Sequence, residues 1–305
     1  IIPKNDEFFS EYVSESKDNL KFISKFTGSS GFALILKKKN YIFVDGRYSL
    51  QAKIECGSEF NIITFPKKLP KDILKSKNIK IGFDPKLHTE TAISFFFQQT
   101  KCKLVAIKKN LIEIIRGNKK DKINNKFYLL KDENVGENFK KKIIKVSNIL
   151  KKKKINIHFV SAPENIAWLL NIRGRDSKYS PLPNSYLTLD DKQKINFFCD
   201  LRKIDKKIKY KLKNINIFDI KTIDKYLGSI KNKKIQIDEN SCSILFKNIL
   251  KVNNTIIKSI DPIYILKSIK NKIEIKNIIK THIVDGVSVT KFLIWLNKNF
   301  NKSKI

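Results

Sequence analysis

The chain has 305 residues, enough for one large domain or two of ordinary size. It carries 63 Lys and Arg against 29 Asp and Glu, yet only five of the basic residues are Arg, and lysines occur in nearly every segment. Base-specific nucleic-acid binding is disfavoured, because it relies on the bidentate Arg fork. The longest uncharged stretches span 11 residues, too short to cross a membrane.

Strand and helix patterns alternate through both halves of the chain. In the first half, strands are predicted at residues 31–36, 41–45, 61–65, 80–83 and 103–107, with a helix at 89–99. In the second half, strands are predicted at 156–160, 185–189, 194–200, 215–220 and 255–260, with a helix at 241–250. This alternation predicts two tandem α/β domains with mixed sheets, residues 1–120 and 121–262, divided near 117–125.

The two halves also resemble each other. Residues 19–28 align with 165–174, residues 80–84 with 234–238, and residues 110–116 with 261–267. Each half has a predicted hairpin, and its second strand leads into an Asp-x-Arg motif, at Asp45-Gly46-Arg47 and at Asp200-Leu201-Arg202. Coincidence in an Ile- and Lys-rich chain is the alternative, but three collinear matches favour an internal duplication.

The last forty residues match neither half. Apolar and small residues recur there at steps of three and four, which predicts one stripe of a long helix: Ile275, Ile279, His282, Gly286, Val289, Leu293 and Leu296. We expect residues 263–305 to open a third, incomplete domain. Because the apolar partner of the stripe would be missing, we expect poor solubility of the chain.

Four cysteines lie at wide spacing, without a Cys-x-x-Cys pair or a Cys/His cluster. The spacing favours reduced core thiols in a cytoplasmic protein over a disulfide framework or a zinc site. His88 and His158 are isolated in the sequence and are predicted to be structural, and Phe22 and Trp168 are predicted to be core aromatics.

Each of the few arginines is a candidate for a planar, bidentate role that Lys cannot fill. Arg47 sits where a strand ends and a helix pattern begins, a position that suits a projecting functional side chain. Arg173, Arg175 and Asp176 fall in one loop, which predicts a charge-paired loop at a domain or subunit interface.

Six stretches resemble, in order, the three-domain Xaa-Pro aminopeptidases (aminopeptidase P) of the creatinase-like group. They are FTGSSG at 26–31, FVDGRYSLQA at 43–52, GFDP at 82–85, APENIAWLLNIRGRD at 162–176, LKSIKN at 266–271 and THIVDG at 281–286. Around residues 110–120, where the family usually has a Trp and an Arg-Pro pair, this chain has Ile115 and Arg116-Gly117 instead.

The resemblance implies two creatinase N-terminal-like domains, followed by a long helix that opens a pita-bread metallopeptidase domain. In the family that domain holds two divalent metals, usually Mn²⁺, through two Asp, one His and two Glu, and cleaves peptides with proline in second position. All those ligands fall after residue 305, so we expect no catalytic residue and no metal ligand in this chain, which should be inactive alone. His282 and Asp285, three apart on the last helix, are expected to be ordinary helix positions.

For the intact enzyme, the resemblance implies that Arg47 contacts the bound peptide and that the protein is a cytoplasmic homodimer. The alternative for Arg47 is a buried structural pair with Asp45 or another acid. The alternative for the chain is a non-catalytic creatinase-like scaffold, and nucleic-acid binding ranks last.

Overall fold

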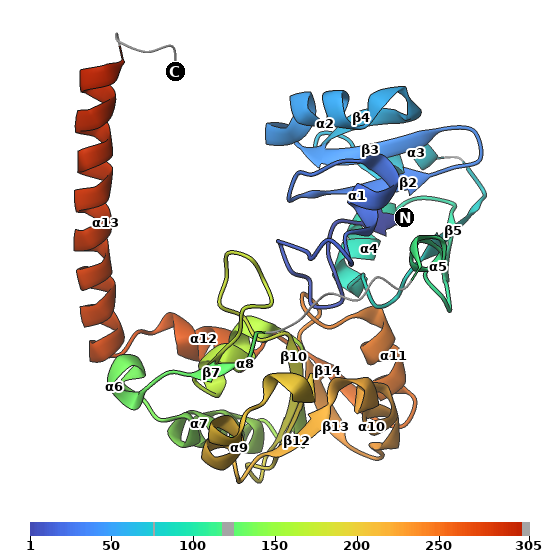
Figure 1. Cartoon of the computed structure of the whole chain (residues 1–305). Coiled ribbons are helices and arrows are strands. Elements are labelled where there is room, and N and C mark those ends of the chain that lie inside the picture. The colour runs from blue at the N-terminus through green and yellow to red at the C-terminus, as the bar shows by residue number, and fades with distance from the viewer. Residues whose placement is uncertain (76, 118–124, 301–305) are drawn as a thin grey trace.

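The computed structural model describes residues 1–75, 77–117 and 125–300. Figure 1 shows two α/β repeats, one above the other, and a long C-terminal helix standing beside them. The expected fold class, two tandem α/β domains with mixed sheets and a long terminal helix, is confirmed.

The first repeat is built on a four-stranded sheet of order β1-β2-β3-β4 and a separate parallel pair, β5 and β6. Within the sheet, β1–β2 and β2–β3 are antiparallel and β3–β4 is parallel. The strands are β1 (Ile2–Pro3), β2 (Gly31–Ile35), β3 (Asn40–Asp45), β4 (Phe60–Phe65), β5 (Lys80–Phe83) and β6 (Lys103–Ala106). The helices are α1 (Asn19–Ser24), η1 (Gly46–Tyr48), α2 (Ser49–Glu55), η2 (Gly57–Glu59), α3 (Pro70–Leu74), α4 (Glu90–Phe97) and α5 (Leu111–Arg116).

The second repeat has one six-stranded sheet of order β12-β11-β10-β8-β13-β14. Its strands are β8 (Ile157–Val160), β10 (Ser185–Asp190), β11 (Ile195–Cys199), β12 (Asn216–Asp219), β13 (Lys234–Ile237) and β14 (Thr255–Lys258), and β7 (Tyr128–Leu129) pairs with β9 (Ile172–Arg173) beside it. The helices are α6 (Asp132–Val135), α7 (Phe139–Lys152), α8 (Pro163–Leu169), η3 (Leu201–Lys203), α9 (Lys206–Lys211), η4 (Ile220–Thr222), α10 (Ile223–Ser229), α11 (Ile244–Lys251) and α12 (Pro262–Ser268).

Strand order and direction repeat between the two sheets. In each, a first strand pairs antiparallel with a hairpin whose second strand continues into a parallel edge strand: β1, β2, β3, β4 and β8, β10, β11, β12. In the second repeat β8 also pairs with β13. In that place in the first repeat, the Ile1 nitrogen donates to the Gly82 carbonyl oxygen of β5 at 2.8 Å. The topology therefore supports the predicted internal duplication.

Equivalent segments of the two repeats meet in one of the contacts between them. Thr89 and Ser243, which cap the N-termini of α4 and α11, lie opposite each other in an antiparallel bridge. The Ile244 amide donates to the His88 carbonyl oxygen at 2.9 Å. At the edge of this contact, Glu90 of the first repeat accepts hydrogen bonds from Lys247 and Lys258 of the second.

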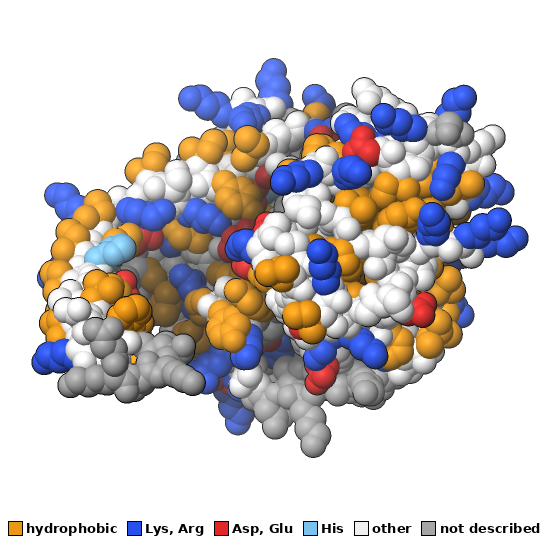
Figure 2. All heavy atoms as spheres, turned by 90° about the horizontal axis from the view of Figure 1, so that it is seen from above, with side chains coloured by type: hydrophobic (Ala, Val, Ile, Leu, Met, Phe, Trp, Pro, Cys, Tyr) orange, Lys and Arg blue, Asp and Glu red, His pale blue; other side chains and the backbone are white. Residues whose placement is uncertain are grey.

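The long helix α13 (Lys272–Asn299) begins at a capping box, in which Asn271 and Glu274 satisfy each other's backbone N–H groups. No residue of α13 is buried. The predicted stripe is too narrow, because exposed apolar side chains such as Ile273, Val284 and Trp295 lie on its other sides. Figure 2 looks along this helix, and a hollow separates it from the repeats. So many exposed apolar side chains normally mark a surface that a partner covers.

No helix in residues 1–75, 77–117 or 125–300 combines the length and the apolar character needed to cross a bilayer. The four cysteines are free thiols, and Cys56, Cys199 and Cys242 are buried.

Candidate functional site

Arg47 stands on the surface at the end of β3. The Asp45 side chain caps the turn η1 and accepts hydrogen bonds from the Arg47 amide at 3.0 Å and from Nε at 2.9 Å. These bonds, the side-chain bond first, hold the pKa of the Asp45 carboxyl below its usual value. The Arg47 side chain is 72% exposed and its guanidinium lies 5.4 Å from the centre of the Tyr48 ring. The pair with Asp45 exists, but it is not buried.

The second repeat contains the same arrangement. Asp200 caps η3 and accepts from the Arg202 amide at 3.0 Å and from Nη2 at 2.6 Å. The Arg202 side chain is 71% exposed. The Asp-x-Arg pair is therefore a property of the duplicated turn, and any special role of Arg47 must come from what surrounds it.

The surroundings of Arg47 do differ from those of Arg202. Tyr48, next to Arg47, lines a cavity of about 380 Å³ together with Tyr12 and Tyr179, whose rings meet edge to face with centres 4.7 Å apart. The Tyr48 hydroxyl lies 2.9 Å from Ser29 Oγ in the glycine-containing turn before β2. Sequence reasoning missed Tyr12 and Tyr179, because both lie in loops where no periodic pattern marks them.

The loop with Arg173 and Asp176 is charge-paired, although the partner was not foreseen. Asp176 pairs with Lys203 at 2.5 Å and accepts from the Asn184 amide at 2.7 Å. Arg173 instead donates to two backbone carbonyl oxygens, those of Ala167 and Ile172. Arg175 is exposed.

The two isolated histidines, which were predicted to be structural, are buried. His88 Nδ1 lies 2.9 Å from the Asp84 carbonyl oxygen, and burial lowers the pKa of His88 to about 4. His158 Nε2 lies 2.9 Å from Asp261. Of the two predicted core aromatics, Trp168 packs against the main apolar cluster of the second repeat. The prediction for Phe22 was wrong: the residue is 46% exposed, and the Arg116 guanidinium lies 5.9 Å from the centre of its ring.

A metal site needs several hard or nitrogen ligands in one place. Within the described part of the chain, no group of three or more His, Cys, Asp and Glu side chains could hold an ion. His282 and Asp285 lie exposed on α13. These residues do not fit a dinuclear metal centre.

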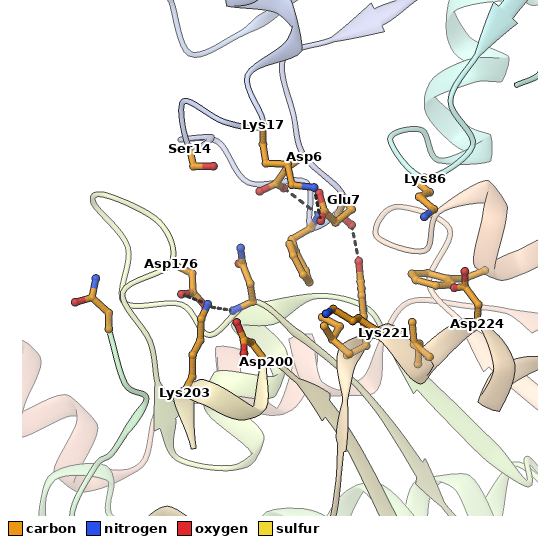
Figure 3. A pocket seen from close by; sticks show the side chains of 17 residues that line it. Asp6, Glu7, Ser14, Lys17, Lys86, Asp176, Asp200, Lys203, Lys221 and Asp224 are labelled. Atoms are coloured by element: carbon orange, nitrogen blue, oxygen red, sulfur yellow. Dashed lines mark hydrogen bonds and ion pairs between the residues drawn. The ribbon is translucent and has the colours of Figure 1, made fainter. Parts of the chain in front are cut away.

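A larger cavity, about 590 Å³, lies between the two repeats (Figure 3). Asp6, Glu7, Lys17 and Lys86 enter it from the first repeat, above. Its other walls come from the second repeat: Asp176, Asn184, Tyr186, Asp200, Lys203, Ile220, Lys221, Ile223, Asp224 and Phe246. The loop of residues 5–18 reaches this place because the Tyr186 hydroxyl donates to the Glu7 carbonyl oxygen at 2.8 Å.

Comparison with known proteins gives matches along nearly the whole chain. Residues 6–116 and residues 118–274 each match the family described as "Creatinase/Prolidase N-terminal domain". The chain is 31% identical over 318 residues to Xaa-Pro aminopeptidase 1 of Dictyostelium discoideum, covering 98% of this chain and 50% of that protein. It is 28% identical over 326 residues to probable Xaa-Pro aminopeptidase P of Laccaria bicolor, covering 100% of this chain and 50% of that protein.

Among solved structures, the X-prolyl aminopeptidase of Caenorhabditis elegans, described as a cytosolic enzyme with a di-nuclear active site, matches with a TM-score of 0.86. The match covers 99% of this chain and 52% of that one at 24% identity, and it shows a common fold. The chain spans about half the length of the curated relatives it matches.

Proposed function

The chain belongs to the creatinase/prolidase N-terminal domain family, and from that premise we propose that it forms the N-terminal part of a Xaa-Pro aminopeptidase. The intact protein would release the N-terminal residue from peptides with proline in second position. The observation that carries the proposal is the match of both repeats, in order, to the first half of proteins with that name.

In this proposal the catalytic metals, two divalent ions such as Mn²⁺, are held outside the described residues, which offer no donor set for them. The helix α13 would be covered by the catalytic domain. Its many exposed apolar side chains support that role, because a partner normally covers such a surface.

The two repeats would support substrate binding and dimerisation in a cytoplasmic enzyme. Arg47 would contact the peptide. The position of Arg47 supports this role, because its guanidinium is exposed on a capped turn, next to Tyr48 and to a cavity with an aromatic rim. A guanidinium in such a place can bind a peptide carbonyl or carboxylate with two donors.

Hydrolysis of Ala-Pro-Ala and of Ala-Ala-Ala by the purified full-length protein tests this function. We expect release of alanine from the proline peptide only, loss of that activity after treatment with EDTA, and recovery when Mn²⁺ is added back. If neither peptide is cleaved with Mn²⁺, Co²⁺ or Zn²⁺ present, the aminopeptidase proposal fails and a non-catalytic scaffold takes its place.

A further inference from the structure

The cavity between the repeats differs in charge from the rest of the molecule. The chain as a whole has 63 basic and 29 acidic residues. The cavity is lined by four lysines and five carboxylates: Lys17, Lys86, Lys203, Lys221, Asp6, Glu7, Asp176, Asp200 and Asp224. A polyanion would meet more carboxylates than ammonium groups there, so the cavity does not share the anion-attracting character of the surface.

Pairing within the protein accounts for some of these charges. Lys17 lies 3.2 Å from Glu7, Lys203 lies 2.5 Å from Asp176, and Asp200 is bound by Arg202. The side chains of Lys86, Lys221 and Asp224 make no hydrogen bond or ion pair with any residue that the structure describes. Charges of both signs are therefore available at the rim of one cavity.

The floor of the cavity is aromatic and is shared by the two repeats. Phe8 stacks on Tyr186 with ring centres 5.0 Å apart, and Phe246 meets the Tyr186 ring edge to face at 4.8 Å. Ile220 and Ile223 extend this apolar surface. A volume near 590 Å³ lies within the range of small-molecule sites, roughly 300–1,000 Å³.

We propose that this cavity binds a small zwitterion with an apolar side chain, either a free amino acid or a short peptide. Asp224 receives the ammonium group, Lys86 and Lys221 receive the carboxylate, and the side chain lies on the floor formed by Phe8, Tyr186 and Phe246. Both repeats contribute, so an occupied cavity ties them together. The proposal does not depend on the proposed aminopeptidase function.

Isothermal titration calorimetry on the full-length protein tests the proposal with four probes: L-phenylalanine, the dipeptide Gly-Phe, phenethylamine and 3-phenylpropionate. We expect at least one of the two zwitterions to bind with a Kd of about 1 mM or lower. Each single-charge analogue should bind at least about tenfold more weakly, the loss expected for one ion pair of about 1.4 kcal/mol. Binding of L-phenylalanine identifies the free amino acid as the ligand class, and binding of Gly-Phe alone identifies a peptide.

Asp224→Asn and Lys221→Gln should each weaken binding of the zwitterion about tenfold. Both side chains are exposed and unpaired, so neither change should disturb folding. Glu133→Gln on α6 and Lys192→Gln between β10 and β11, both exposed, are the matched controls and should leave affinity unchanged. The proposal would be overturned if neither zwitterion binds, or if the single-charge analogues bind as tightly as the zwitterions. It would also be overturned if all four variants bind the zwitterion with the same affinity. None of these results depends on peptide hydrolysis, so this proposal and the aminopeptidase proposal can fail independently.

Discussion

The two repeats have the same strand order, but they build the centre of the sheet differently. In the second repeat, β8 pairs with a neighbour on each side and joins six strands into one sheet. In the first repeat, β5 and β6 form a sheet separate from the four strands that include β1, and a hydrogen bond runs from Ile1 to the Gly82 carbonyl oxygen of β5. A continuous central strand buries its side chains on both faces, and in the second repeat this strand carries the fully buried His158.

The N-cap of the last helix shows the consequence. In the first repeat, Asn110 caps α5 and donates to Asp84 at 2.9 Å in a half-buried position. At the equivalent place in the second repeat, Asp261 caps α12, is 1% exposed, and contacts His158 of β8 and Asn165 of α8. Burial acts to raise the pKa of Asp261, but attraction to His158 and the hydrogen bonds lower it overall. One cap is neutral and the other belongs to a buried charged network.

Exchanging the two caps tests that difference and should give the largest effect. Asp261→Asn removes the buried carboxylate that lies against His158 and accepts from Asn165, and it should cost about 3 kcal/mol of unfolding free energy, the upper end for hydrogen bonds to a charged group. Asn110→Asp replaces a hydrogen bond to Asp84 with repulsion at a wetter site and should cost about 1 kcal/mol. Urea unfolding measures both changes in unfolding free energy. Hydrogen exchange of the amides in β5 and β8 shows which repeat loses stability. Equal costs would show that the repeats do not differ in this way.

A buried lysine gives the second repeat a distinctive alkaline response. Lys142 of α7 is 1% exposed, donates to the Trp168 carbonyl oxygen and to Asn171, and has a pKa lowered by burial to about 8. Between about pH 8 and the unfolded value of 10.5, the unfolded chain binds this proton and the folded chain does not, so folding becomes more favourable as pH rises. Over that pH range, the unfolding free energy of the wild type should rise by about 2 kcal/mol relative to that of Lys142→Met. Unfolding free energies at pH 7.5 and 10 check this, and a pH-independent difference would contradict it.

The ion-pair cluster between the repeats should give the smallest effect. A hydrogen bond from Lys247 is the main cause that lowers the pKa of Glu90 to about 2. The stabilisation this provides is present above about pH 4.5 and is lost as pH falls toward 2. Because the pair is partly exposed, Glu90→Gln should cost about 0.2–1 kcal/mol at pH 6 and less at pH 3. Thermal unfolding at the two pH values measures it, with the exposed Glu59→Gln as control. If Glu90→Gln lost more stability at pH 3 than at pH 6, the result would contradict a lowered pKa of Glu90 in the folded protein.

The longer strands and the helices α4, α11 and α13 could be predicted from the sequence, because strand alternation and helical periodicity are local signals, but the helix α7 was not predicted. The predicted strands 61–65 and 103–107 differ from β4 and β6 by one residue at one end. Contacts between distant segments could not be predicted. The approach of His158 to Asp261 joins residues about a hundred positions apart, and Tyr12 meets Tyr179 only because two loops fold together. Phe22 was misplaced because an apolar residue in a short helix does not reveal what covers it.

The two repeats have similar Asp-x-Arg turns, and we propose that only the first one contacts the peptide. Arg47→Lys and Arg202→Lys in the full-length protein test this proposal, because both arginines are exposed and each is paired with the Asp two positions before it. For peptides longer than the dipeptide, Arg47→Lys should raise KM about tenfold with kcat unchanged, since Lys lacks the planar fork. Arg202→Lys should change neither constant. Unchanged kinetics for Arg47→Lys, or an equal rise in KM for both variants, would contradict the account.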